Sequence, residues 1–260
     1  MRGSMAILAA LALTIPAAAK VKTELVEYKQ GDVVLQGYIC YDESMTGKRP
    51  GILVVHDWLG VSDDTKMRAE MLAGLGYVAL TADIYGKGVR PKNAQEAQAE
   101  VGKYYGDRTL WRARAKAGLD FLAARPEVDP ARLGAMGYCF GGGTVLELAR
   151  SGAPVKGTVT FHGSLSTPTP DDAKNIKGKV LVLHGADDPY VKQADVTAFM
   201  DEMRKAGVDW QLVQYSGAVH AFTIKREGTD NSKGAAYNAE ADRRSWEAMK
   251  DFWKEVFPGM

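Results

Sequence analysis

Cysteine and histidine are scarce in this chain, whose 260 residues include two cysteines and four histidines. Two cysteines far apart in the sequence, Cys40 and Cys139, are too few for the dense disulfide framework of a small secreted protein. No pair of candidate ligands has the helical or hairpin spacing typical of a metal site, so we expect no bound metal. The histidines that could serve as a general base are His56, His162, His184 and His220.

An excess of charge of one sign is also missing. Lys and Arg total 33 and Asp and Glu total 32, which gives a net charge of +1, and the basic residues are scattered. This distribution argues against nucleic acid or an anionic membrane surface as a partner. Hydrophobic residues make up 46% and charged residues 25%, the composition of a globular protein. No repeat, low-complexity tract or linker divides the chain after Lys20, so residues 20–260 are predicted to form one catalytic domain, and no pattern specifies an oligomeric state.

The most apolar stretch is residues 6–19, and it is too short to span a membrane. It is rich in Ala and Leu and ends in three alanines before Lys20, the small-residue pattern expected at a signal-peptidase site. We therefore predict that residues 1–19 are a signal peptide, whose first four residues could be a short expression leader before a native start at Met5. We also predict that the mature protein is periplasmic or secreted and free of the membrane. The other interpretation is a buried N-terminal helix, which the abrupt change to polar sequence at Lys20 disfavours.

Short apolar runs alternate with longer segments of helical period, a pattern typical of a parallel sheet with crossover helices. The runs are residues 51–56, 77–82, 133–137, 157–161 and 180–184. Before them, Gly31-Asp32 separates two strand-like segments and predicts an antiparallel hairpin. We therefore predict an α/β fold, with a mostly parallel central sheet, helices on both faces and an N-terminal antiparallel hairpin.

Apolar residues at helical spacing between these runs predict helices that pack against the sheet. The stripes are Met67, Met71 and Leu75; Leu110, Ala113, Ala117 and Phe121; Val196, Phe199, Met200 and Met203; and Trp246, Met249, Trp253 and Val256. The third stripe ends at Gly207, a residue suited to the position just after a helix. We interpret all four stripes as core packing.

A pentapeptide with glycine at both ends, Gly137-Tyr138-Cys139-Phe140-Gly141, lies where a buried strand ends and a helical segment begins. Gly-x-nucleophile-x-Gly at a strand-to-helix turn is the nucleophile elbow of α/β-hydrolases. The turn is tight, so the residues two before and two after the nucleophile must lack a Cβ. The alternative is that Cys139 is a small buried hydrophobic residue. The flanking strand and Gly-rich helix start favour a cysteine nucleophile.

A thiol nucleophile requires a base and a group that orients the base. Asp188 follows a buried strand, and His220 follows a turn after the last strand-like run, 209–215. The chain order Cys139, Asp188, His220 is that of α/β-hydrolases. Asp187 competes for the role of the acid, but Pro189 would fix the turn at Asp188. We predict a Cys139, His220 and Asp188 triad.

Acyl transfer also requires donors that bind the oxyanion. The backbone N–H of Phe140, directly after the nucleophile, is one predicted donor. The other should come from the loop after the strand 51–56, where we choose the N–H of Trp58. Trp58, Tyr85 and Tyr105 are also candidates for the substrate pocket, and the two tyrosines could equally be packing residues.

Three segments of this sequence resemble the dienelactone hydrolase family. They are Gly-Tyr-Cys-Phe-Gly-Gly, His-Gly-Ala-Asp-Asp-Pro and Gly-Ala-Val-His-Ala-Phe, and the similarity extends over about residues 24–257. The apolar prefix and residues 237–246 are most similar to a periplasmic bacterial branch of that family. The resemblance implies an α/β-hydrolase fold with an eight-stranded type of sheet, a Cys-His-Asp triad and no cofactor.

The resemblance also implies two charged groups near the thiol. Family members that cleave dienelactone carry a Glu on the first loop, which holds the resting thiol proton; the matching residue is Asp57. They also carry arginines that bind the substrate carboxylate, and Lys225 occupies one such place here. A lysine lacks the bidentate fork of a guanidinium, which makes dienelactone itself a poor candidate for the natural substrate.

Together these patterns predict a carboxylesterase or lactonase that cleaves a small-molecule carboxylic ester or lactone through a thioester acyl-enzyme. Two other classes remain. A thiol redox or sensor protein would use Cys139 and Cys40 as a pair, and a non-catalytic binding module could use the same fold.

Overall fold

The computed structural model describes residues 19–260. The predicted signal peptide therefore lies, except for Ala19, outside the described residues. The described chain forms an eight-stranded sheet with the order β1-β2-β4-β3-β5-β6-β7-β8. Strands β1 and β2 are antiparallel to each other, β2 is antiparallel to β4, and the remaining pairs are parallel. The fold is that of an α/β-hydrolase, as the sequence predicts.

The strands are β1 (Val21–Gln30), β2 (Val33–Asp42), β3 (Arg49–Val55), β4 (Val78–Ala82), β5 (Val128–Tyr138), β6 (Gly157–Phe161), β7 (Lys179–Gly185) and β8 (Trp210–Tyr215). The α-helices are α1 (Asp63–Gly74), α2 (Ala94–Gly106), α3 (Arg108–Ala123), α4 (Phe140–Arg150), α5 (Gln193–Ala206) and α6 (Ala239–Val256). Three short 3-10 helices complete the described elements: η1 (Pro170–Asn175), η2 (Lys225–Glu227) and η3 (Asn231–Lys233).

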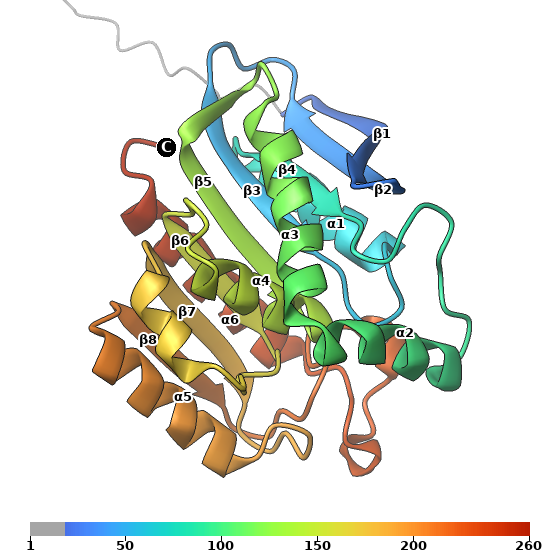
Figure 1. Ribbon diagram of the computed structural model, residues 1–260, viewed down its shortest axis with the longest axis vertical. Helices are drawn as coiled ribbons and strands as arrows, with labels where there is room; N and C mark the ends of the chain where they lie inside the picture. The colour runs from blue at the N-terminus through green and yellow to red at the C-terminus, as the bar shows by residue number, and fades with distance from the viewer. Residues whose placement is uncertain (1–18) are drawn as a thin grey trace, which may run out of the picture.

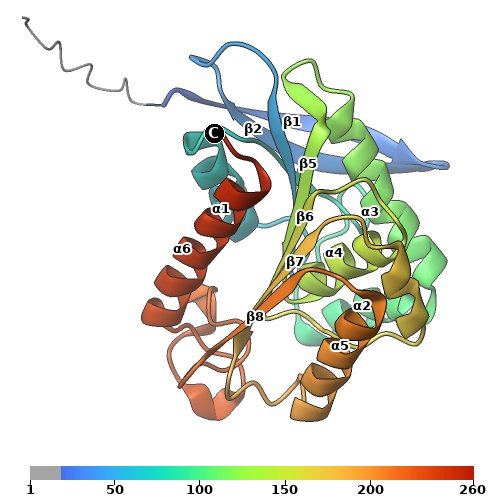
Figure 2. The same cartoon turned by 90° about the vertical axis from the view of Figure 1, so that its left-hand side faces the viewer.

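Helices cover both faces of the twisted sheet. Helices α1 and α6 lie on one face, whereas α3, α4 and α5 lie on the other, as the edge-on view of Figure 2 shows. Strands β3 and β4 are buried along their whole length, which explains their continuous apolar sequences. The predicted hairpin is also confirmed, with Gly31 at a φ of 57° in the turn between β1 and β2 (Figure 1).

The predicted packing face of α1 is wrong. Met67, Met71 and Leu75 are 39%, 37% and 43% exposed. The buried side of the helix carries Thr65, Arg68, Ala69, Leu72 and Ala73 instead. Arg68 lies on this side because its guanidinium forms a buried ion pair with Asp242 of α6. Apolar spacing alone could not reveal a face that includes a charged residue whose partner lies in the last helix.

The loops that follow the parallel strands gather at one edge of the sheet, because parallel strands present their carboxyl ends to the same side. The segments that follow β3, β5, β7 and β8 contain Asp57, Cys139, Asp188 and His220 respectively. The topology thus collects residues from four distant parts of the chain. Within residues 19–260, no helix is long and apolar enough to cross a membrane.

Candidate active site

Cys139 occupies a strained turn between β5 and α4. Its backbone has φ 54° and ψ −115°, in a region that residues with a side chain rarely adopt. The conformation is held from both sides: the Cys139 N–H donates to the carbonyl of Phe161 at 3.0 Å, and its own carbonyl accepts from the N–H of Gly142 at 3.0 Å. Strain at this residue is therefore maintained by the adjacent strand and helix.

The two glycines of the elbow have steric reasons to be glycine. A Cβ on Gly137 would overlap the carbonyl of Gly141, and a Cβ on Gly141 would overlap the carbonyls of Val55 and His56. The first clash would prevent the turn from closing. The second would push α4 away from β3, because Val55 is the last residue of that strand. The predicted spacing of glycines around Cys139 is thus explained by close backbone approach.

His220 is the residue that contacts the thiol. Its Nε2 lies 3.1 Å from Sγ of Cys139, and its Nδ1 lies 2.8 Å from Oδ2 of Asp188. The imidazole is held edge-on between two aromatic rings, with centroid distances of 5.3 Å to His162 and 5.4 Å to Tyr190. The structure therefore brings together the three residues that the sequence selected as nucleophile, base and acid.

Backbone hydrogen bonds hold the Asp188 carboxylate in place beside His220. Its Oδ1 accepts hydrogen bonds from the N–H groups of Tyr190 at 2.8 Å and Val191 at 3.2 Å, which leaves Oδ2 for His220. Burial raises the pKa of the Asp188 carboxyl, but the hydrogen bonds from His220 and the two amides outweigh burial and lower the pKa below its usual value. Asp187, the alternative acid, instead accepts from the N–H of Gly217 at 3.1 Å.

Two backbone amides have no acceptor within the described chain, namely those of Trp58 and of Phe140, the residue next to Cys139. These are the two donors predicted for an oxyanion. The Trp58 loop is anchored by side chains beneath it: His56 Nδ1 donates to the carbonyl of Asp57 at 2.6 Å, and the Tyr85 hydroxyl donates to the carbonyl of Trp58 at 3.0 Å. His56 Nε2 accepts from the N–H of Ile84 at 3.2 Å, which assigns the proton to Nδ1.

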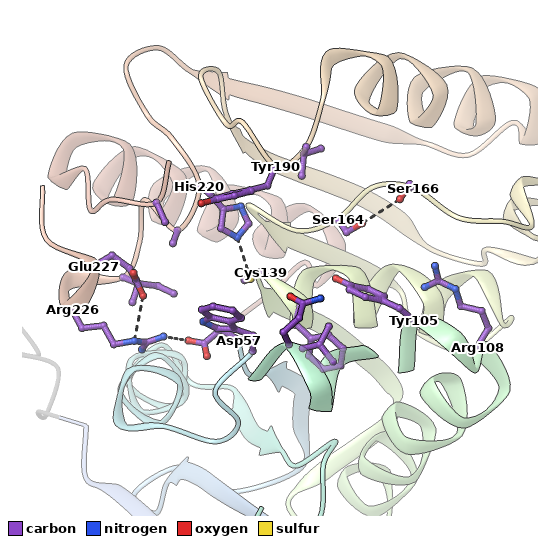
Figure 3. A pocket seen from close by; sticks show the side chains of 18 residues that line it. Asp57, Tyr105, Arg108, Cys139, Ser164, Ser166, Tyr190, His220, Arg226 and Glu227 are labelled. Carbon is purple, nitrogen blue, oxygen red and sulfur yellow. Dashed lines mark hydrogen bonds and ion pairs between the residues drawn. The ribbon is translucent and has the colours of Figure 1, made fainter. Parts of the chain in front are cut away.

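A pocket of about 510 Å³ opens above Cys139 and His220. Figure 3 shows these two residues near its middle, with Asp57, Arg226 and Glu227 on one side and Tyr105, Arg108, Ser164 and Ser166 on the other. Its volume suits a small organic molecule. Among residues 19–260, no group of three or more His, Cys, Asp or Glu side chains is placed to hold a metal ion.

Residues 35–257 match the sequence profile of the dienelactone hydrolase family. The chain belongs to this family. A Synechocystis sp. protein provisionally named carboxymethylenebutenolidase is 26% identical over 252 residues, which cover 90% of this chain and 97% of the relative. The family assignment and this relative identify the protein as a dienelactone hydrolase-like hydrolase that acts on esters or lactones.

Two solved structures of dienelactone hydrolase type are similar to this one over most of their length. A protein named m3DLH is 43% identical, with a TM-score of 0.88, and the match covers 91% of this chain and 99% of that one. The dienelactone hydrolase-like promiscuous phosphotriesterase P91, from metagenomic libraries, is also 43% identical, with a TM-score of 0.86 and coverage of 91% and 98%. The shared fold extends beyond the elbow to nearly the whole described domain.

Asp57 lies differently from the arrangement that the family resemblance implied. Its carboxylate is ion-paired with Arg226, accepts from the N–H of Leu59 at 2.8 Å, and makes no hydrogen bond to Cys139 within the described residues. Arg226 also binds Asp64. The aspartate is one methylene shorter than the glutamate of dienelactone-cleaving members, and a guanidinium lies within its reach. His220, rather than Asp57, contacts the Cys139 thiol.

The pocket predictions are partly corrected. Tyr105 lines the pocket, but Tyr85 and Lys225 do not. Tyr85 is only 4% exposed and lies beneath the Trp58 loop, packed against His56 and Phe140. Lys225 is exposed and its ammonium faces the ring of Tyr237, whereas the next residue, Arg226, lines the pocket.

Sequence reasoning missed several residues of the pocket wall. They include Gln98, Arg108, Ser164, Ser166, Tyr190, Arg226 and Glu227. Most of them lie in loops or at helix ends and belong to no local motif. Tyr190 could have been suggested by its place two residues after Asp188, since the loop that presents the acid also lines the site. Nothing in the sequence distinguishes Arg108 from the other arginines of α3.

A disulfide between Cys40 and Cys139 does not fit the fold. Both thiols are free, and Cys40 is fully buried in β2. Cys40 pairs with Ala79 at the start of β4, which is level with Ile52 of β3 and Gly134 of β5. Three strand spacings of roughly 4.8 Å therefore separate Cys40 from β5, whereas a disulfide requires Cα atoms within about 7 Å. The redox-pair interpretation is thus contradicted.

Proposed function

We propose that this protein hydrolyses carboxylic esters or lactones through a thioester intermediate on Cys139. The observation that carries the proposal is the contact between the Cys139 sulfur and Nε2 of His220, whose other nitrogen is bound to Asp188. A thiol, a base and an orienting carboxylate within hydrogen-bond reach form the minimal apparatus for nucleophilic acyl transfer. The cysteine stands at the floor of a pocket that a small ester can enter.

His220 is well suited to take the thiol proton. Burial lowers the pKa of its imidazole, but the adjacent Cys139 sulfur and the Asp188 carboxylate outweigh burial and raise the pKa of His220 to about 10. A ring with this pKa holds a proton at neutral pH. The proton removed from sulfur is then available on Nε2, the nitrogen nearest the reacting atoms.

Acylation begins when the Cys139 thiolate attacks the substrate carbonyl carbon and a C–S bond forms. The carbonyl π electrons move to oxygen, and we assign this oxyanion to the free N–H groups of Trp58 and Phe140. The tetrahedral intermediate collapses with cleavage of the C–O bond. His220 gives its proton to the departing alcohol oxygen, and Cys139 is left as a thioester.

Deacylation reverses these roles. Neutral His220 removes a proton from a water molecule, whose oxygen attacks the thioester carbonyl. The same two amides receive the oxyanion, and collapse breaks the C–S bond. Cys139 leaves as the thiolate and the product is a carboxylic acid. His220 keeps the proton from water and is ready to protonate the next leaving group.

A substrate panel combined with acyl-enzyme trapping tests this proposal. The panel contains a short p-nitrophenyl ester, an aliphatic lactone, a carboxylated dienelactone and an acyl thioester. We expect hydrolysis of at least one of these. Acid quenching during turnover should leave an acyl group on the peptide that contains Cys139, measured by mass spectrometry and released by hydroxylamine, because a thioester is the intermediate.

The pocket offers its own control for this trapping. Ser164 and Ser166 are hydroxyl groups in the same cavity, so an acyl group on either serine would refute the assignment of Cys139 as the nucleophile. Hydrolysis without any acyl group on Cys139, under conditions where deacylation limits turnover, would contradict the thioester step.

The Tyr85 hydroxyl is expected to position the Trp58 amide. Tyr85→Phe removes the hydrogen bond to the Trp58 carbonyl and keeps the ring that packs against His56 and Phe140. We expect kcat to fall about three- to tenfold with little change in KM, because a buried hydrogen bond contributes roughly 1 kcal/mol and this one acts through the oxyanion donor. Steady-state kinetics on a p-nitrophenyl ester measures the two parameters separately.

Tyr104→Phe is the matched control for this variant. Tyr104 belongs to the same aromatic cluster, is 2% exposed, and donates to the carbonyl of Ile84 at 2.9 Å rather than to a carbonyl of the Trp58 loop. Its loss should lower the melting temperature about as much as Tyr85→Phe but leave kcat nearly unchanged. Equal losses of kcat in the two variants would show that Tyr85 stabilises the domain in general.

Phosphotriesters form a second candidate substrate class. The relative P91, 43% identical over 91% of this chain, is described as a promiscuous phosphotriesterase. A nucleophile with two adjacent amide donors could also attack a phosphoryl centre and stabilise charge on its oxygen. Release of p-nitrophenol from paraoxon by the wild type and not by Cys139→Ala would support this activity.

We also propose that residues 1–19 direct export and are removed. The proposal rests on the uncharged Ala- and Leu-rich sequence that ends before Lys20. N-terminal sequencing of the protein recovered from a periplasmic extract should begin at Lys20. Recovery of the uncleaved chain from the cytoplasm alone would contradict the proposal.

A further inference from the structure

The charges that line the pocket are compensated on one side of Cys139 and not on the other. On the first side, Arg226 is ion-paired with Asp57 and Asp64, and its Nε lies 3.6 Å from Glu227. On the opposite side, Arg108 lines the same pocket, and no carboxylate of residues 19–260 lies within 4 Å of its guanidinium (Figure 3). The pocket therefore contains one cation that this part of the chain leaves without a counter-charge.

Arg108 is held in place by aromatic rings. Its guanidinium carbon lies 4.7 Å from the ring centroid of Trp111 and 5.7 Å from that of Tyr105. Trp111 in turn stacks on Phe140, with centroids 5.2 Å apart and planes at 9°, and its indole N–H donates to Thr144 at 2.7 Å. A continuous stack thus connects the guanidinium to the residue next to Cys139, so its position relative to the nucleophile is fixed.

The Arg108 side chain makes no hydrogen bond to any residue of the described chain. Its Nε is buried and has no hydrogen-bond partner among the described residues. Arg112, one turn further along α3, is by contrast paired with both Glu147 and Asp172. Arg108 is also the first residue of α3, where the helix dipole disfavours a cation. Burial lowers the pKa of Arg108, which is a further sign that its charge lacks solvation.

Two hydroxyl groups border the same side of the pocket. Ser164 and Ser166 lie in the loop after β6, and their oxygens are 3.4 Å apart. A guanidinium supplies several N–H donors in a planar fork, and serine hydroxyls supply further donors. Donors of this kind from two separate segments match the oxygens of a carboxylate.

We propose that Arg108, with Ser164 and Ser166, binds a carboxylate at the far end of the acyl chain of the substrate. The preferred substrates are then monoesters of dicarboxylic acids. This inference rests on the proposed function, because it places the scissile carbonyl at Cys139.

The acyl chain, rather than the alcohol, is assigned to this side for a chemical reason. His220 must protonate the departing alcohol, so the alcohol oxygen lies beside Nε2. Figure 3 places His220 and Arg108 on different sides of Cys139. An acyl chain that extends away from His220 can therefore reach Arg108, while the alcohol leaves on the histidine side.

The test compares p-nitrophenyl esters of adipic and pimelic acid, whose far end is a free carboxylate, with esters of the same length whose far end is a primary amide. We expect the wild type to have the higher kcat/KM for the carboxylates. In Arg108→Gln the ratio of kcat/KM for carboxylate over amide should fall about 10- to 100-fold, the range for loss of a charge-assisted hydrogen bond. Use of the ratio cancels any general effect on catalysis.

Lys116→Gln is the matched control. Lys116 is on the same helix, is 57% exposed and pairs with Asp120, so this variant changes the net charge equally without touching the pocket. Its ratio should equal that of the wild type. Arg108→Glu should turn the preference towards an ester with a terminal trimethylammonium group, a gain that misfolding could not produce.

Failure of this inference can be separated from failure of the proposed function. Hydrolysis of the amide-terminated ester that disappears in Cys139→Ala, together with a ratio that does not change in Arg108→Gln, would overturn the carboxylate site alone. A wild-type ratio near one would do the same. Hydrolysis that survives in Cys139→Ala would overturn the thiol mechanism.

Discussion

Replacing Cys139 by alanine is expected to reduce ester hydrolysis to the rate of the spontaneous reaction. The variant retains the pocket and the free amides of Trp58 and Phe140, but no atom remains to form the acyl-enzyme. Loss of a nucleophile from a triad elsewhere lowers kcat by roughly 10⁶-fold. Alanine has a Cβ in the same place as cysteine, so the strained turn at φ 54° is no worse for it. Initial rates on a p-nitrophenyl ester measure the effect.

Cys40→Ala provides the matched control, because it removes the other thiol of the chain. Cys40 is fully buried in β2, and burial raises the pKa of its thiol to about 12, so it is not a nucleophile at neutral pH. We expect this variant to hydrolyse esters at nearly the wild-type rate with a lower melting temperature. Substantial hydrolysis by a folded Cys139→Ala protein would refute the proposed mechanism.

His220→Ala should lower kcat by roughly a thousandfold or more. The variant loses the base that receives the thiol proton and the acid that protonates the departing alcohol, both of which depend on the 3.1 Å contact with sulfur. It also leaves the buried Asp188 carboxylate without its partner. His184→Gln is the control, since His184 lies on β7 and makes no hydrogen bond to Cys139 in the described chain. Comparable losses in both variants would contradict the assignment of His220.

The pH dependence of kcat/KM provides a second test of His220 as the acid, because a purely structural role would not produce a decrease at its pKa. Its pKa is raised to about 10, so the ring is protonated at neutral pH and loses its proton as the pH rises through 10. For an alkyl ester, whose alkoxide must be protonated, kcat/KM should be steady up to about pH 9 and then decrease. A p-nitrophenyl ester needs no proton on its leaving group and should show a much weaker decrease. The same falling limb for both esters would argue against His220 as the acid.

The local part of the site was predictable because short-range physics determines it. Gly137 and Gly141 leave room for a turn that any larger residue would block, so the pentapeptide around Cys139 predicts an elbow before any tertiary contact is known. Continuous apolar runs likewise predict the parallel strands, because strands that are buried on both faces of a sheet must be apolar at every position. The chain order of Cys139, Asp188 and His220 then follows from topology.

The charged lining of the pocket could not be predicted in the same way. Asp57 contacts Arg226, and Arg68 contacts Asp242, across most of the length of the chain. Such pairs depend on where α1, α6 and the loop after β8 are placed by the packed sheet. The buried face of α1 was mispredicted for the same reason, since Arg68 is buried only because Asp242 meets it there.

The sequence by itself thus determined the fold class, the family, the position of the proposed nucleophile and the chain order of its two proposed partners, because these depend on spacing and on short segments. The tertiary structure decided which carboxylate meets His220, that Asp57 is directed to Arg226, that Tyr85 supports the Trp58 loop from below, and that Arg108 stands without a counter-charge in the described pocket. These features depend on contacts between side chains of separate elements, and such contacts form only once the sheet and its loops have packed.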